Sequence, residues 1–310
     1  MRHSRACAKV RVVILPRRVA LQDFEYVVPS SLDEAVRLMA EKGSKARALA
    51  GGTDILVQLR AKRYVIDRLV DIKNVSEMNE LTCSEQQGLV LGAAVPCYRI
   101  YQDQTVARLY PGLIDSAAMI GGIQIQGRAS IGGNLCNAAP SADGIPPLIA
   151  LEALCTVAGP NGRRTVKVEE FCTGPGQTVL QDGELLVSIY LPPPKRNSGA
   201  HYLRFIPRNE MDIAVAGVGV SVVLSNGKIE SARIALASVA PTPVFATEAA
   251  AVLVGKEANE SAVLEAAEEA KKAAKPISDM RGTIEQRIHL VGVLTKRALN
   301  KAIARAKGAE

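Results

Sequence analysis

The apolar residues of this chain follow helical spacing in some segments and short continuous runs in others, which predicts alternating strands and helices near its amino end. The run Phe24 to Val28 is typical of a strand and stops at Pro29. Ser31 and Glu34 have the spacing of a capping box, so a helix is expected to begin there. That helix ends near Gly43, and its apolar face is formed by Leu32, Ala35, Val36, Met39 and Ala40.

A glycine loop lies inside the next predicted repeat of strand and helix. The loop is Gly51-Gly52-Thr53-Asp54, and it separates a short run at residues 47–50 from a helical segment at residues 55–61. An apolar strand at residues 69–72 completes a βαβ unit, which places the loop at the carboxyl end of its strand. Unpaired backbone N–H groups and the positive end of a helix dipole converge there, so an anion site is expected. Asp54 is expected to cap the helix.

A second glycine-rich turn strengthens the interpretation of the first. A lone Gly-Gly turn is common for structural reasons, but Ser130-Ile131-Gly132-Gly133-Asn134 provides another turn with hydrogen-bonding side chains beside the glycines. Two such turns suggest one extended ligand. Because Gly51 and Gly52 have no side chains, the ligand is expected to approach the backbone there. Neither turn has the glycine spacing of the nicotinamide dinucleotide fingerprint, and the chain contains no P-loop motif. The ligand therefore requires another nucleotide-binding fold.

The rest of the chain divides at a proline run. With 310 residues, two packed domains are expected, and Pro192 to Pro194 break the chain between them. Beyond the break, residues 214–224 and 228–236 are predicted to be strands of a hairpin around Ser225-Asn226-Gly227. An Ala-rich helix over residues 261–274 and a long basic helix after Thr283 follow. Residues 1–22 are predicted to be a basic, disordered extension.

Composition and charge narrow the class of protein. The chain is 48% hydrophobic and 22% charged, as in ordinary globular proteins, and its longest apolar stretches are too short to span a bilayer. The net charge of +7 comes from scattered basic residues with only 4% aromatics, which argues against nucleic-acid binding. The six cysteines lack the short paired spacings of a metal or iron–sulfur site, and reduced thiols in the cytoplasm are expected. No histidine lies beside a serine or cysteine nucleophile motif, so none is expected to be catalytic.

Both glycine segments, together with later landmarks, resemble the FAD-binding subunit of molybdenum hydroxylases, the family of carbon monoxide dehydrogenase and xanthine dehydrogenase. The first segment is Ala50-Gly51-Gly52-Thr53-Asp54, and the second is Ser130 to Asn134. The resemblance covers residues 23–305, and its later landmarks are Phe171 to Gly176, Gly183 to Leu186, Arg208 with Asp212 to Ala214, and Ser278 to Gly282.

The resemblance implies a mixed α/β (α+β) fold with two domains. Residues 23–194 are expected to form a bilobal FAD-binding domain of the vanillyl-alcohol-oxidase (PCMH) type, with lobes at about 23–80 and 81–194. Residues 195–310 are expected to form a smaller α+β domain like that of the carbon monoxide dehydrogenase flavoprotein.

The resemblance also implies the residues that hold FAD. A first segment is expected to wrap the pyrophosphate, namely Ala48, Leu49, Ala50, Gly51, Gly52, Thr53, Asp54 and Ile55. A second is expected beside the isoalloxazine and ribityl groups, namely Ser130, Ile131, Gly132, Gly133 and Asn134. Asp143, Leu186 and Arg204 match further contacts, although the residues alone are also consistent with a surface position for Arg204. Some relatives carry an aromatic residue over the flavin at the position of Ile213.

The function implied is electron transfer. A large molybdopterin subunit would oxidise substrate, a small subunit would relay electrons through [2Fe-2S] clusters, and FAD in this chain would pass them to NAD, a quinone or oxygen. A dimer of heterotrimers is expected, with no metal or cluster in this chain. The alternative is a scaffold subunit that keeps the fold without binding flavin, and two intact glycine loops argue against it.

Overall fold

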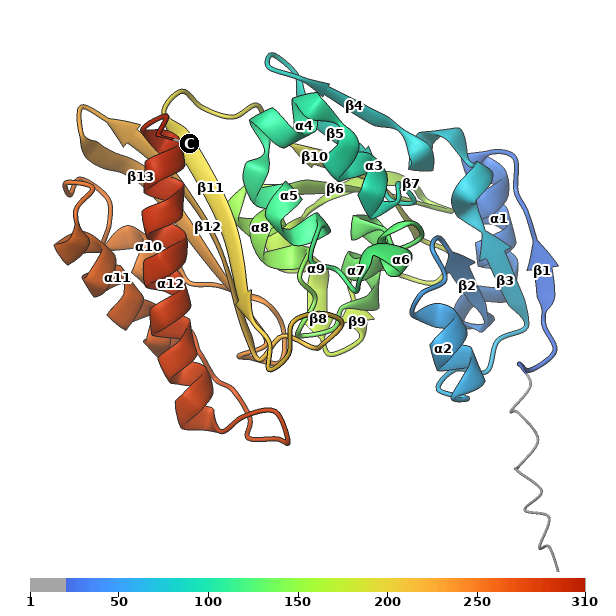
Figure 1. Cartoon of the computed structure of the whole chain (residues 1–310). Coiled ribbons are helices and arrows are strands. Elements are labelled where there is room, and N and C mark those ends of the chain that lie inside the picture. Colours follow the sequence, from blue (N-terminus) through green and yellow to red (C-terminus); the bar gives the residue numbers. More distant parts are fainter. Residues whose placement is uncertain (1–20, 310) are drawn as a thin grey trace, which may run out of the picture.

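A three-stranded parallel sheet forms the lobe at the amino end of the computed structural model, which describes residues 21–309 (Figure 1). Both outer strands pair in parallel with the central strand, so the predicted βαβ unit is confirmed. The strand order is β1-β3-β2, and the elements are β1 (Glu25–Val27), α1 (Leu32–Lys42), β2 (Ala46–Leu49), α2 (Ile55–Arg60) and β3 (Arg68–Asp71). All three strands therefore end at one edge of the sheet, where the glycine loop follows β2.

The start of α1 shows how the local sequence determines this lobe. The Ser31 hydroxyl accepts a hydrogen bond from the Glu34 amide at 3.2 Å. The Glu34 carboxylate accepts from the Ser30 amide at 2.8 Å, one residue earlier than in a standard capping box. The helix stops at Gly43, whose φ of +52° suits a residue without a side chain. The predicted helix and its ends are confirmed.

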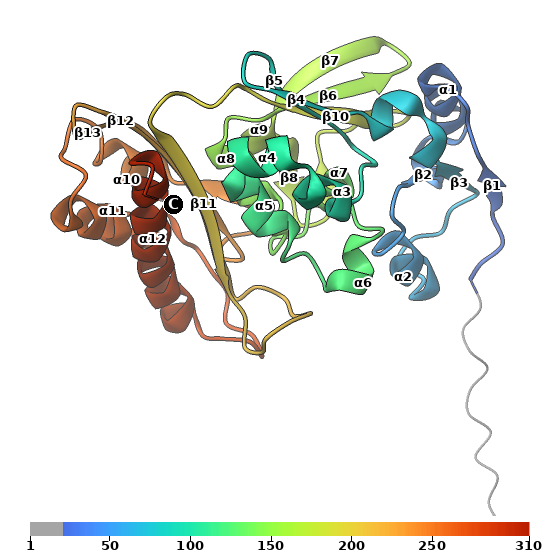
Figure 2. The ribbon, with the colours of Figure 1, turned by 45° about the horizontal axis from the view of Figure 1, so that its top comes forward.

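The second lobe is built on a five-stranded antiparallel sheet with several short helices. Its strand order is β4-β5-β10-β6-β7, from β4 (Leu81–Ser84), β5 (Gly88–Gly92), β6 (Leu154–Gly159), β7 (Gly162–Lys167) and β10 (Leu185–Leu191). Figure 2 shows several of the helices below these strands. They are α3 (Cys97–Gln102), α4 (Gln104–Leu109), α5 (Pro111–Ala117), α6 (Ile123–Gln126), α7 (Ile131–Asn137), α8 (Ile145–Ala150) and α9 (Val168–Phe171), followed by a small hairpin of β8 (Cys172–Gly174) and β9 (Gln177–Thr178).

The carboxyl-terminal region is a four-stranded antiparallel sheet with helices on its outer face (Figure 1). Its elements are β11 (Ser198–Phe205), β12 (Ala216–Ser225), β13 (Lys228–Ala237), β14 (Val244–Phe245), α10 (Thr247–Ala251), α11 (Glu260–Ala273) and α12 (Ile284–Ala306). Asn226 and Gly227 have φ values of +50° and +78°, so the predicted hairpin and its tight turn are confirmed. The predicted Ala-rich helix and the long helix after Thr283 also form.

The inner face of this sheet packs directly on the second lobe. A Cβ atom added at Gly219 of β12 would lie 2.6 Å from the carbonyl carbon of Pro146 in α8, so only glycine permits this approach. The three sheets thus lie side by side along the molecule. The division into lobes at residue 80 and into domains at residue 194 stays a prediction, and the predicted extension falls outside the described residues except for residues 21 and 22.

A charged cluster joins the two larger sheets. Asp115 of α5 accepts a bidentate pair of hydrogen bonds from Arg305 of α12, at 2.6 and 3.1 Å. The Nδ1 atom of His201 in β11 lies 2.5 Å from the same carboxylate. Burial opposes ionisation of Asp115, but the hydrogen bonds and charges of His201 and Arg305 outweigh it and lower the pKa of Asp115. His201 therefore contributes to the contact between the second lobe and the carboxyl-terminal sheet.

The lowered pKa of Asp115 predicts acid-sensitive stability. Its contribution is fully present above the unfolded value of about 3.9 and is lost as the pH falls through the lower folded value. We therefore expect wild-type protein to lose more stability than Asp115→Asn in urea unfolding between pH 5 and pH 2.5. Asp23→Asn, at an exposed position, is the control, and its free energy of unfolding should change with pH as that of the wild type does. Equal pH slopes for wild type and Asp115→Asn would contradict the prediction.

Candidate flavin site

The glycine loop after β2 presents a set of backbone N–H groups that have no partner among the residues that the structure describes. Gly52 has a φ of +81°, which turns the chain sharply into α2. The carbonyls of Gly52 and Asp54 accept from the amides of Leu56 and Gln58, which starts the helix. Within residues 21–309, however, the amides of residues 51–54 donate to no protein acceptor. Such a group of free donors is suited to bind a phosphate.

The second glycine segment lies against this loop. A Cβ atom on Gly51 would lie 2.0 Å from the carbonyl oxygen of Arg128, just before Ser130. Gln58 of α2 also donates to the side chain of Asn137 in α7 at 2.8 Å. The expectation that Gly51 leaves room for a ligand is therefore wrong on its Cβ side, because the protein's own backbone fills that space.

The segment from Ser130 to Asn134 is the start of a helix, whereas the sequence predicts a turn. Ser130 is the N-cap of α7, and its hydroxyl accepts from the Gly133 amide at 3.0 Å. Gly132 is required by packing, since a Cβ atom there would lie 2.5 Å from the Ala93 carbonyl oxygen. Asn134 accepts from the Gly144 amide at 2.9 Å, so α7 fixes the position of the segment that carries Asp143.

Asp143 belongs to a buried polar group that spans the two domains. The Tyr202 hydroxyl donates to one carboxylate oxygen of Asp143 at 2.6 Å, and the Arg204 guanidinium bonds to the other. Burial raises the pKa of Asp143, against the opposing effects of Arg204 and Tyr202. Burial and the neighbouring carboxylate also raise the pKa of Tyr202 well above its usual value, so this hydroxyl remains a donor.

Arg204 is not a surface residue, because only 7% of its side chain is exposed. This part of the sequence prediction is wrong, since the Asp143 carboxylate offsets the cost of burying the guanidinium. Tyr202 was missed by sequence reasoning. The signal that identifies it is strand periodicity, because residues two apart in β11 point to the same face.

The other predicted contacts are more widely placed. Leu186 is a core residue of β10 that is only 3% exposed, and it pairs with Val157 of β6. Asp54 makes no side-chain capping hydrogen bond, so its expected role as a helix cap is wrong.

Ile213 is half exposed and lines a cavity of about 360 Å³ with Gly121, Arg208, Met211, Asp212 and Arg281. A second hollow of about 510 Å³, near the end of α12, is lined by none of the predicted site residues.

Two of the described cysteines, Cys97 and Cys155, are buried, and Cys83, Cys136 and Cys172 are partly buried. Burial raises the pKa of Cys136 to about 12 and that of Cys172 to about 11, so both remain protonated near neutral pH. Within residues 21–309, no group of three or more His, Cys, Asp or Glu side chains is arranged to hold a metal ion. The absence of a cluster from the whole chain stays a prediction.

One feature of this loop is compatible with a pyrophosphate such as that of FAD. Within residues 21–309 the amides of residues 51–54 have no protein acceptor, and they follow β2 at the carboxyl edge of the parallel sheet. Asn134 of the second segment bonds to the Gly144 amide, which links this segment to the Asp143 group and through it to Tyr202 of the carboxyl-terminal domain.

Comparison with known proteins identifies the family. Residues 22–194 match the FAD binding domain in molybdopterin dehydrogenase, and residues 201–302 match the CO dehydrogenase flavoprotein C-terminal domain. The xanthine dehydrogenase FAD-binding subunit of Escherichia coli O157:H7 is 33% identical, over 90% of this chain and 96% of that protein. The carbon monoxide dehydrogenase medium chain of Hydrogenophaga pseudoflava is 34% identical, over 91% of this chain and 98% of that protein.

A solved structure of carbon monoxide dehydrogenase from Hydrogenophaga pseudoflava superimposes with a TM-score of 0.88, covering 92% of this chain and 99% of that one at 34% identity. Both domains of the mixed α/β fold therefore have counterparts in a known flavoprotein chain. The chain belongs to the FAD-binding subunits of the molybdopterin dehydrogenases, and it is an oxidoreductase subunit of the carbon monoxide and xanthine dehydrogenase type.

Proposed function

We propose that this chain takes electrons from the [2Fe-2S] clusters of a partner subunit and passes them through FAD to NAD, a quinone or oxygen. The observation that supports this best is the junction of two backbone segments, at which the loop that carries the free amides of residues 51–54 meets Arg128 and Ala129 at Gly51. Bound FAD supplies the redox chemistry, and the protein supplies binding and orientation. We propose that the substrate of the complex is selected by the molybdenum subunit.

The residues of the chain have separate roles in this proposal. Residues 48–55 hold the pyrophosphate through backbone amides, and Thr53 adds a hydroxyl. Residues 130–134 lie along the ribityl and isoalloxazine part, and Leu186 is a further contact in this proposal. Arg204 acts as a positioning residue, because its guanidinium is already bonded to the Asp143 carboxylate.

The test is flavin content. Full-length protein is purified, its visible absorption spectrum is recorded, and the flavin released on denaturation is identified by chromatography. The expected result is FAD near one per chain. If no flavin is present and FAD does not bind on reconstitution, the chain is a scaffold subunit and the electron-transfer proposal is wrong.

We propose that the partners are a large molybdopterin subunit and a small [2Fe-2S] subunit, arranged as a dimer of heterotrimers in the cytoplasm. The relatives are themselves named as a FAD-binding subunit and a medium chain. No helix within residues 21–309 is long and apolar enough to cross a membrane.

The exposed apolar residues Ile277 and Met280 precede Arg281 in the chain. Arg281 lines the cavity of about 360 Å³ together with Met211 and Ile213.

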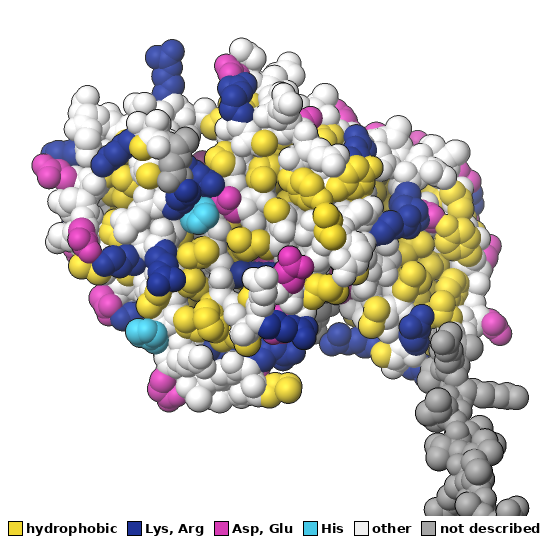
Figure 3. All heavy atoms as spheres, in the orientation of Figure 1, with side chains coloured by type: hydrophobic (Ala, Val, Ile, Leu, Met, Phe, Trp, Pro, Cys, Tyr) yellow, Lys and Arg dark blue, Asp and Glu magenta, His cyan; other side chains and the backbone are white. Residues whose placement is uncertain are grey.

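The exposed apolar surface formed by Ile277 and Met280 is typical of a protein contact surface. Ile277 is 71% exposed and Met280 is 92% exposed. In Figure 3, hydrophobic and basic side chains lie together on the lower part of the visible face, where Figure 1 places the loop after β11 and the segment before α12. An apolar surface with arginines beside it suits an acidic partner subunit.

A charge at Met280 is expected to weaken assembly by at least about tenfold, because it would be buried without a partner in the complex. The measurement is the affinity of Met280→Asp for the two partner subunits, by light scattering on co-expressed protein. Val254→Asp is the matched control, since Val254 is 52% exposed on the turn after α10. Equal affinity of the two variants would exclude this surface as the contact.

A further inference from the structure

Two aspartates, Asp54 and Asp71, lie at the carboxyl edge of the parallel sheet. Asp54 lies in the glycine loop, and its side chain forms no ion pair within residues 21–309. Asp71 ends β3 at the same edge, and it is paired with Lys73 at 2.6 Å and hydrogen-bonded to Tyr26. Lys73 is therefore already paired with Asp71, and a pyrophosphate at this edge would be stabilised by a further cation.

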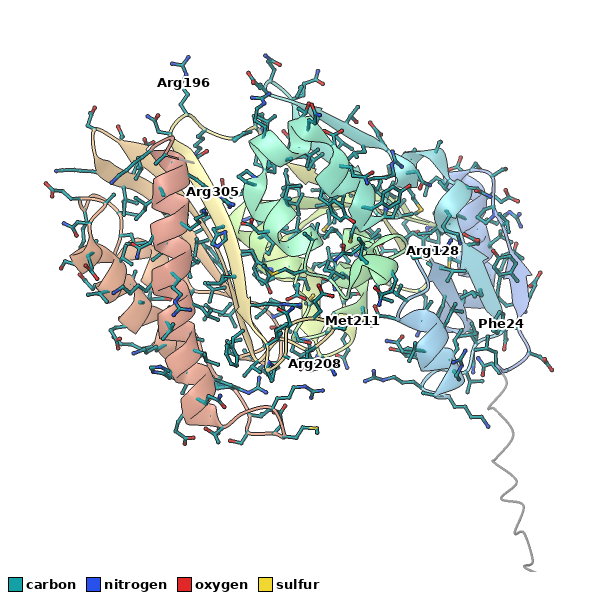
Figure 4. The ribbon with its side chains drawn as sticks, in the orientation of Figure 1. Phe24, Arg128, Arg196, Arg208, Met211 and Arg305 are labelled. Atoms are coloured by element: carbon teal, nitrogen blue, oxygen red, sulfur yellow. The ribbon has the colours of Figure 1, made fainter. Side chains whose placement is uncertain are left out.

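Arg128 is positioned to supply that cation. Its carbonyl oxygen occupies the space beside Gly51, so its backbone is in direct contact with the loop. Its side chain is exposed and forms no hydrogen bond or ion pair with other described residues. Figure 4 shows Arg128 between the helices of the second lobe and the three-stranded sheet.

The electrostatic influence of Arg128 reaches the same edge. The hydrogen bond to Asp71 and burial raise the pKa of Tyr26, while the charge of Arg128 acts against them. Arg128 therefore lies within electrostatic range of the Tyr26 hydroxyl, which bonds to Asp71 at the carboxyl end of β3.

We propose that Arg128 binds the FAD pyrophosphate and selects for a flavin that carries it. This inference rests on the proposed function, since it places the phosphates at residues 51–54. The amides supply direction, and the guanidinium supplies the compensating charge through forked hydrogen bonds. Riboflavin, which has no phosphate, gains nothing from this residue.

The test measures the affinity of apo-protein for FAD, ADP and riboflavin by calorimetry. Arg128→Gln should lower the affinity for FAD and for ADP by about tenfold to a hundredfold, as expected for the loss of a charged hydrogen bond. It should leave riboflavin unchanged, and Arg128→Lys should recover part of the affinity. The control is Arg196→Gln, another exposed arginine without a described partner, which Figure 4 shows far from Arg128.

The outcomes separate this inference from the proposed function. If wild type binds FAD and Arg128→Gln binds it within about twofold, Arg128 is not a phosphate ligand. If the affinity for riboflavin falls by the same factor as the affinity for FAD, the substitution does not act through the phosphates, and the inference is also wrong. If wild-type protein binds no FAD, the proposed function fails and takes this inference with it.

Discussion

Gly51→Ala is expected to weaken FAD binding by at least about tenfold, because the new methyl group would overlap the carbonyl oxygen of Arg128. The Cβ position lies 2.0 Å from that oxygen, and both atoms belong to the backbone or are fixed to it. One of the two segments must therefore move, at a cost of about 1–3 kcal/mol. The free amides of residues 51–54 belong to the glycine loop, so a shift between the two segments is expected to turn these amides away from the FAD phosphates.

The measurement for Gly51→Ala is FAD affinity by quenching of flavin fluorescence, together with thermal unfolding. Gly127→Ala is the matched control, since Gly127 has a φ of −64° and no atom lies within 4 Å of its Cβ position. It lies in the same segment as Arg128 but should bind FAD like wild type. Similar affinities for the two alanine variants would show that contact between the segments is not needed.

Asp143→Ala is expected to lower the free energy of unfolding by about 3–5 kcal/mol, because it leaves a buried arginine without its counter-charge. Arg204 and Asp143 are 7% and 9% exposed at their side chains, so water cannot replace the lost bond. Tyr202 would lose its acceptor as well. The second lobe and the carboxyl-terminal domain would be held together less firmly, since the group joins them.

Urea unfolding measures the effect of Asp143→Ala, and Glu85→Ala is the control. Glu85 pairs with Arg108 at the surface, where removal of a carboxylate should cost about 1 kcal/mol or less. The double variant Asp143→Ala with Arg204→Met should recover part of the loss, because no charge is then left buried. If Asp143→Ala is no more destabilised than Glu85→Ala, the pair does not hold the domains together.

The sequence was informative wherever a few neighbouring residues determine the backbone. Ser31 and Glu34 predicted the start of α1, and Asn226 with Gly227 predicted the turn between β12 and β13. Such features depend on hydrogen bonds and dihedral preferences within one turn of chain. The same local reasoning failed at Ser130 to Asn134, where two glycines suggested a turn. There the serine cap and the close approach of Ala93 favour a helix.

Contacts between distant segments were beyond the sequence. Arg204 was assigned no buried partner, because nothing near it in the chain indicates Asp143, which lies 61 residues away. Asp115 and Arg305 are 190 residues apart. Asp54 has the residue type of a helix cap, yet its side chain makes no capping bond in the folded loop. Side-chain type limits the possible partners, and the packing of the sheets selects one.

The amino-acid sequence by itself determined the strands and helices of residues 24–72 and of the region after residue 214, the two glycine segments and the resemblance to a flavoprotein family. These follow from residue spacing and motif order, which do not depend on the final packing. Only the tertiary structure decided that Gly51 must be glycine because of Arg128, that Asp143 is held by Tyr202 and Arg204, and which amides remain free. The physical reason is that burial and non-local contact set the energy of these polar groups.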